Sequence, residues 1–81
     1  MEVQVKLFAV AREAAGRDVV TLALPDGATV ADLRAALVTA VPQLAGAVRS
    51  LLFAVDAAYA ADDAPLSPGA EVACIPPVSG G

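Results

Sequence analysis

Helical periodicity is strong in only one segment of the chain, and this limits the fold more than any other feature of the sequence. Four apolar residues recur there at the spacing of one helix face: Val30, Leu33, Leu37 and Val41. Residues 29–32 have the outline of a capping box that would start the helix. Pro42 ends it, because proline disfavours helical geometry in the residue before it. We therefore predict one main helix, from about residue 30 to residue 40.

The segments on either side of this helix show the two-residue alternation of β-strands. From residue 3 to residue 10, apolar residues on one face alternate with Gln4, Lys6 and Phe8 on the other, which is typical of a sheet covered on one side only. Residues 11–15 are predicted to form a helical turn that Gly16 stops. Further strands are predicted at residues 19–24, 50–56 and 71–75, with a short edge strand at Tyr59.

This order of elements predicts an α+β fold, with a mixed sheet of four to five strands and one main helix packed on one face. The first two strands should form a hairpin, and the helical crossover should place the next strand parallel to its partner. Residues 50–56 are almost continuously apolar, so we predict that this strand is central. Such an arrangement is the β-grasp, or ubiquitin-like, fold. Residues 1–77 would form this domain, and residues 78–81 an extended tail; residues 43–49 remain unassigned.

Composition excludes several classes of protein. The chain has 81 residues, the size of one small domain, and a net charge of -4, which argues against nucleic acid as the main partner. No apolar run approaches the roughly 20 residues of a membrane span. One cysteine and no histidine make an internal disulfide impossible and a metal site implausible. We expect a soluble, cytoplasmic domain that uses neither membrane nor nucleic acid.

The side chains that usually carry catalysis are missing. There is no histidine to act as a base near neutral pH. Asp62 and Asp63 lie in a proline-bounded turn, where adjacent carboxylates are typical of a solvated loop. Cys74 alternates with Val72 in the last strand and is predicted to be a small buried hydrophobe. The chain by itself is therefore not expected to be an enzyme.

The end of the sequence points instead to a working tail. Pro76 and Pro77 stop the last strand and stiffen the exit of the chain. Beyond them come four residues without bulk, which at full extension span about 13 Å; they are Val78, Ser79, Gly80 and Gly81. Glycine lets one backbone approach another closely, and a glycine carboxylate is an uncrowded nucleophile. We predict that this tail enters the cleft of a partner protein.

Three stretches of the chain resemble the small-subunit family of molybdopterin synthase, the MoaD family. They are Leu-Phe-Ala-Val-Ala-Arg-Glu at 7–13, Pro-Gly-Ala-Glu-Val-Ala at 68–73 and the tail Pro-Pro-Val-Ser-Gly-Gly at 76–81. The resemblance covers essentially the whole chain, and the tail is its most specific part. A terminal Gly-Gly alone is shared with ubiquitin-like carriers that serve thiamine synthesis and tRNA thiolation.

The resemblance implies that Gly81 is the working group. An E1-like adenylyltransferase would use ATP to convert its carboxylate to an acyl-adenylate, and a persulfide donor would supply sulfur for a thiocarboxylate. The tail would then deliver sulfur to cyclic pyranopterin monophosphate in the large subunit of the synthase, forming the dithiolene of molybdopterin. The large subunit would hold the catalytic groups in a heterotetramer, and this chain would bind no cofactor itself.

Alternation also predicts a surface for these partners. Phe8 and Ile75 are expected on the open side of the sheet, together with Tyr59. The positions that match the family's contact surface, or flank its tail, are Phe8, Arg12, Tyr59, Ile75, Pro76 and Pro77. The family often carries aromatic residues where this chain has Cys74 and Ile75, a difference that bears on the fit to the partner.

Two other functions are compatible with the same residues. One is a sulfur carrier for thiamine synthesis or tRNA thiolation. The other is a ubiquitin-like interaction module, or a protein modifier whose tail forms isopeptide bonds. Both carrier functions require a free carboxylate at Gly81.

Overall fold

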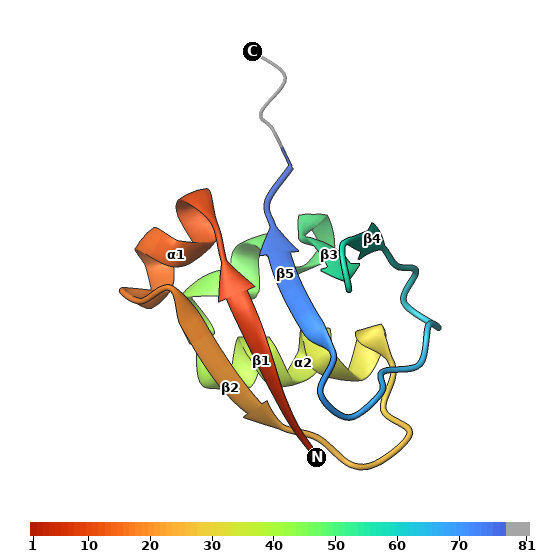
Figure 1. Ribbon diagram of the computed structural model, residues 1–81. Coiled ribbons are helices and arrows are strands. Elements are labelled where there is room, and N and C mark those ends of the chain that lie inside the picture. The colour runs from red at the N-terminus through yellow and green to blue at the C-terminus, as the bar shows by residue number, and fades with distance from the viewer. Residues whose placement is uncertain (78–81) are drawn as a thin grey trace.

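The computed structural model describes residues 1–77, and the predicted tail, residues 78–81, lies outside the described residues. Five strands form one sheet, and helix α2 crosses one of its faces (Figure 1). The strands are β1 (Glu2–Leu7), β2 (Val19–Ala23), β3 (Leu52–Val55), β4 (Ala58–Tyr59) and β5 (Glu71–Ile75). The helices are α1 (Ala9–Ala15), α2 (Val30–Ala40) and the 3₁₀-helix η1 (Pro42–Ser50). The predicted α+β architecture with one main helix on a mixed sheet is confirmed.

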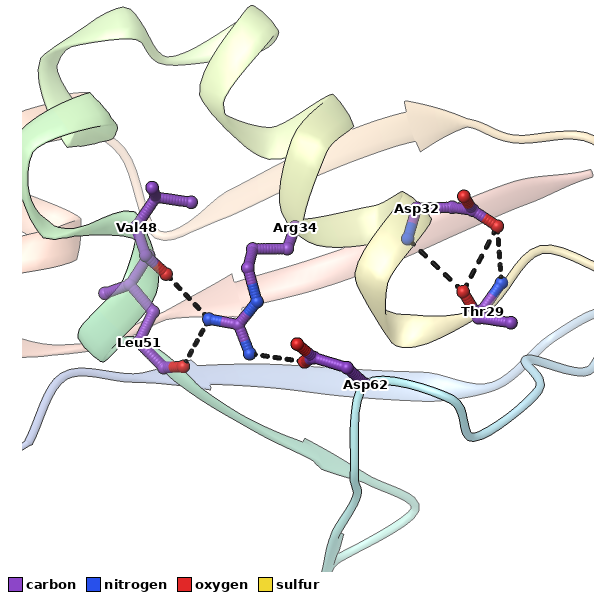
Figure 2. Close-up of polar contacts among 6 residues, drawn as sticks. All are labelled: Thr29, Asp32, Arg34, Val48, Leu51 and Asp62. Atoms are coloured by element: carbon purple, nitrogen blue, oxygen red, sulfur yellow. Dashed lines mark hydrogen bonds and ion pairs between the residues drawn. The ribbon is translucent and has the colours of Figure 1, made fainter.

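Helix α2 forms where the apolar periodicity predicted it. The Thr29 hydroxyl accepts a hydrogen bond from the Asp32 N–H, and the Asp32 carboxylate accepts one from the Thr29 N–H at 2.9 Å (Figure 2). This capping box satisfies N–H groups that the first turn of a helix leaves unpaired. The face turned to the sheet is fully buried at Val30, Leu33 and Leu37. These side chains pack against the inward-facing residues of the strands in one apolar core.

The position and direction of β3 in the sheet differ from the prediction, and the spatial order of the strands shows this. This order is β2-β1-β5-β3-β4, with β1 and β5 parallel and the other neighbours antiparallel. Residues 50–56 were predicted to be central and parallel to a hairpin strand, but β3 is antiparallel to both β5 and β4, and β5 is the middle strand. The apolar run has another cause: Leu51 and Phe53 are buried in the core, whereas Leu52 is exposed on the other face.

The first predicted strand is also too long. β1 ends at Leu7, Phe8 continues in extended conformation as the N-cap of α1, and Val10 belongs to α1 rather than to the sheet. Gly16 ends α1 in the left-handed conformation that glycine adopts without strain, as the sequence predicted. The unassigned residues 43–49 fall within η1, which packs beside α2 and buries Leu44.

A single arginine on α2 binds three later points of the chain. The Nη1 group of Arg34 donates hydrogen bonds to the Val48 and Leu51 carbonyls at 2.6 and 2.7 Å, and Nη2 donates one to Asp62 at 2.7 Å (Figure 2). The guanidinium lies 4.9 Å from the centre of the Phe53 ring. Arg34 therefore joins α2 to the end of η1, the start of β3 and the loop after β4.

Replacing Arg34 by methionine should destabilise the fold more than an ordinary surface substitution. Methionine keeps the aliphatic volume but leaves the Val48 and Leu51 carbonyls without their donor, so we expect a loss of about 3 kcal/mol in the free energy of unfolding. Urea denaturation followed by circular dichroism measures this. The matched change Arg17→Met, at an exposed position, should cost less than about 0.5 kcal/mol. Equal losses in the two variants would contradict a structural role for Arg34.

Candidate functional site

The base of the predicted tail lies at the end of the middle strand. β5 is paired along its length with β1 on one side and β3 on the other. The Phe8 N–H extends the pairing by donating to the Cys74 carbonyl at 3.3 Å. Pro76 and Pro77, the last described residues, follow Ile75 without an intervening turn. The chain that continues beyond Pro77 is thus attached to a strand held from both sides.

Apolar side chains gather at this end of the sheet face that is turned away from α2. The strand register places Ile75 opposite Leu52, and places Ala54 opposite both Ala73 and Tyr59. Side chains of directly opposite residues lie on the same face of a sheet. Phe8 is 44%, Leu52 47% and Tyr59 69% exposed. We call this group the open-face patch; its members are Phe8, Leu52, Ala54, Tyr59, Ala73 and Ile75.

Three of the residues predicted for partner binding therefore belong to one surface. Ile75 is the last residue of β5, and Phe8 lies beside it on the continuation of β1. Tyr59 lies on the edge strand β4, and the small side chains of Ala54 and Ala73 lie between it and the end of β5. Leu52 was missed. The signal was present in the sequence, because Leu51 and Phe53 can share the core only if Leu52 points to the opposite face.

Arg12 lies to one side of the open-face patch. Its Nε is 3.9 Å from Asp18 Oδ1, and its side chain is more than half exposed. Together with Lys6, Phe8 and Asp18, it lines a shallow hollow of about 200 Å³ beside the end of β1. Arg12 is thus adjacent to Phe8 and keeps its guanidinium accessible for a contact across an interface.

Within residues 1–77, no group of three or more His, Cys, Asp or Glu side chains is arranged to hold a metal ion. None of the helices described for this part of the chain is long and apolar enough to cross a membrane.

Comparison with known proteins agrees with this geometry. The model of the ThiS family matches residues 5–81. The chain belongs to the ThiS family. A curated relative, the molybdopterin synthase sulfur carrier subunit of Chlamydomonas reinhardtii, is 41% identical over 83 residues, with all of both chains covered. The resemblance to small subunits of molybdopterin synthase that the sequence indicated is thereby confirmed at the level of the whole chain.

Solved structures confirm the ubiquitin-like β-grasp fold of this ThiS family member. The small archaeal modifier protein 1 of H. volcanii has a TM-score of 0.84 and 31% identity, with 95% of this chain and 98% of that chain covered. A complex of subunits 1 and 2 of molybdopterin-converting factor from Helicobacter pylori contains a chain with a TM-score of 0.69 and full coverage of both chains. At 21% identity, the second likeness shows the shared fold alone.

The one cysteine of the sequence is the penultimate residue of β5 and is chemically unreactive at neutral pH. Cys74 is fully buried, and this burial raises the pKa of its thiol to about 11, although the positive charge of Arg34 acts in the opposite direction. The thiolate, rather than the thiol, is the nucleophilic form of cysteine. Cys74 is therefore protonated and enclosed at neutral pH, and it behaves as the small core residue that the sequence predicted.

The same pKa shift should appear in the pH dependence of stability. An unfolded chain loses the thiol proton near pH 9.0 and the folded chain only near pH 11. The folded state therefore binds more protons between these values, and the free energy of unfolding falls as the pH rises from 9 towards 11. Urea unfolding at pH 8 and pH 10 should show a larger decrease for the natural chain than for Cys74→Ala. The same decrease in both chains would contradict the assignment.

Proposed function

We propose that this chain is the sulfur carrier subunit of molybdopterin synthase, with the carboxylate of Gly81 as its working group. The observation that carries the proposal is the full-length similarity to a curated sulfur carrier subunit. The base of the tail adds support, because Pro76 and Pro77 leave directly from the middle strand beside the open-face patch. A terminal group attached to a strand that is paired on both sides starts from a defined position, which is suited to placing it in another protein's active site.

The chemistry starts from a carboxylate, which is a poor electrophile. An E1-like adenylyltransferase joins the Gly81 carboxylate to the α-phosphate of ATP and releases pyrophosphate, so that AMP becomes the leaving group. The terminal sulfur of a persulfide then displaces AMP. A thiol cleaves the resulting acyl disulfide, which releases the thiocarboxylate and leaves the sulfur donor as a disulfide. We place these steps in the cytoplasm, where thiols are kept reduced.

The sulfur acceptor is cyclic pyranopterin monophosphate, bound in the large subunit of the synthase. The tail brings the thiocarboxylate to this acceptor, and two transfers supply the two sulfurs of the dithiolene. In each transfer the thiocarboxylate sulfur bonds to the acceptor, and water then hydrolyses the bond between this sulfur and the Gly81 carbonyl, which returns the carboxylate. The solved complex of subunits 1 and 2 from Helicobacter pylori supports a large-subunit partner for a chain of this fold. Catalytic side chains come from that partner, in a heterotetramer with two copies of each subunit.

A second candidate function is protein modification. It is favoured by the likeness to a small archaeal modifier protein at 31% identity. A modifier also activates its terminal carboxylate, but the acyl group passes to a lysine amine and forms an isopeptide bond. The two functions therefore differ in the product formed at Gly81, a thiocarboxylate in one and an amide in the other. A carrier for thiamine synthesis or tRNA thiolation shares the thiocarboxylate and differs only in its partner.

Removal of Gly81, or addition of one residue after it, should abolish sulfur transfer without unfolding the domain. The reacting carbonyl would be absent from its position in the partner's site, so we expect no thiocarboxylate and no molybdopterin. Mass spectrometry of the intact protein detects the exchange of one oxygen for sulfur, and circular dichroism checks the fold. Molybdopterin formation by either variant would contradict the carrier function. Lysine-linked conjugates without any thiocarboxylate would favour the modifier.

The open-face patch should supply affinity for the large subunit. Leu52→Ser removes an exposed apolar side chain next to Ile75, so we expect about tenfold weaker binding, with little change in stability. Val19→Ser is the matched control, because Val19 is also an exposed apolar residue but lies on β2, at the far edge of the sheet. Isothermal titration calorimetry with the large subunit measures both variants. Equal weakening in the two would contradict a specific role for the patch.

A further inference from the structure

Positively and negatively charged side chains are distributed unevenly between the two ends of the sheet. Because β1 and β5 run parallel and β2 and β3 run the other way, the register defines one end of the sheet at Ile75 and the opposite end at Glu71. Four of the five Lys and Arg residues belong to the Ile75 end: Lys6, Arg12, Arg17 and Arg49. Arg34, the fifth, is held by Asp62 and two carbonyls.

The charged side chains that the strand register places at the opposite end are acidic, and the one positive group beside them is the N-terminal ammonium of Met1, 3.7 Å from Asp26. Glu2 begins β1, Glu71 begins β5, Asp56 follows β3 and Asp26 lies in the loop after β2. At the Ile75 end, Glu13 and Asp18 are outnumbered by the four cations. The protein has a net charge of -4, yet the end from which the tail leaves has a surplus of positive charge. This is a dipole along the direction of β5, with its positive end at Ile75.

The cations at the Ile75 end flank the open-face patch on both sides. Lys6 and Arg12 line the hollow beside Phe8, on the β1 side of β5. Arg49 lies in the last turn of η1, three residues before Leu52, on the β3 side. All three side chains are exposed. An apolar centre with a charged rim is the usual composition of a protein–protein interface.

We propose that the domain docks tail end first on a partner whose tail-receiving cleft is bordered by carboxylate side chains. One carboxylate would occupy the hollow between Lys6 and Arg12, and another would face Arg49. This inference rests on the proposed function, because it takes the large subunit of the synthase as the partner. Charge complementarity of this kind raises the association rate and orients the encounter. The acidic opposite end would be repelled by the same border, so tail-first encounters are favoured over reversed ones.

The charge pattern suits a protein surface better than a nucleic acid or a free polyphosphate. Glu13 and Asp18 are interspersed with the cations, and Asp18 already lies 3.9 Å from Arg12. A polyanion would meet these carboxylates as well as the cations. A partner protein with separate carboxylate side chains around an apolar surface can place each carboxylate against one cation and leave Glu13 in solvent.

Two variants with the same net charge test the proposal. Arg49→Gln removes one positive charge beside the patch, and Ser67→Glu adds one negative charge in the exposed loop before β5, at the opposite end. The association rate of each full chain with the purified large subunit is measured by stopped-flow fluorescence at low and high salt. We expect Arg49→Gln to slow association about threefold at low salt, Ser67→Glu to have a clearly smaller effect, and the difference to vanish near 0.5 M salt.

Equal slowing by the two variants would mean that net charge alone acts, and would overturn the proposal. Faster association of Arg49→Gln would overturn it too, because it would indicate a basic border on the partner. If the natural chain transfers sulfur normally, neither of these two results would contradict the carrier function. A natural chain that neither carries a thiocarboxylate nor binds the large subunit would refute the carrier function and this inference together.

Discussion

The parallel pairing of β1 with β5 is the constraint on which the rest of the structure depends. It places the last strand between β1 and β3, so that the strand leading to the tail is the middle strand of the sheet. A strand at the edge would have left half of its hydrogen-bonding groups unpaired and the base of the tail free to fray. The middle position gives Pro76 and Pro77 a fixed origin. A reactive terminal group is useful only if its attachment to the domain is well defined.

Because α2 covers only one face of the sheet, one face builds the core and the other is open to a partner. The core lies between α2 and one face of the strands, and its inward side chains are almost completely buried. The other face needs no apolar residues for folding, yet it carries Leu52 and Tyr59 near the end of β5. Exposed apolar side chains that cluster on one face of a sheet are typical of a binding surface. The same sheet therefore builds the core with one face and is free to contact a partner with the other.

Two polar side chains inside the domain, Arg34 and Cys74, stabilise the fold and take no part in the chemistry proposed for the tail. Arg34 satisfies two carbonyls and Asp62 where the chain leaves η1 and enters β3, and so fixes the backbone next to Leu52. Cys74, next to the last residue of β5, is kept protonated by burial and offers no competing thiolate. In the proposed function, the reactive chemistry is thus confined to Gly81, and the charged side chains around the open-face patch orient the approach of the partner.

The sequence by itself determined the helix of residues 30–40 with its capping box, the burial of Cys74, the hairpin and the family. These depend on local spacing, which reports the face that each element buries. Only the tertiary structure decided that β5 rather than β3 is the middle strand, that Leu52 joins Ile75 on the open face and that Arg34 reaches Val48, Leu51 and Asp62. Such facts depend on which distant segments become neighbours, and a pattern of period two or 3.6 carries no information about neighbours in space.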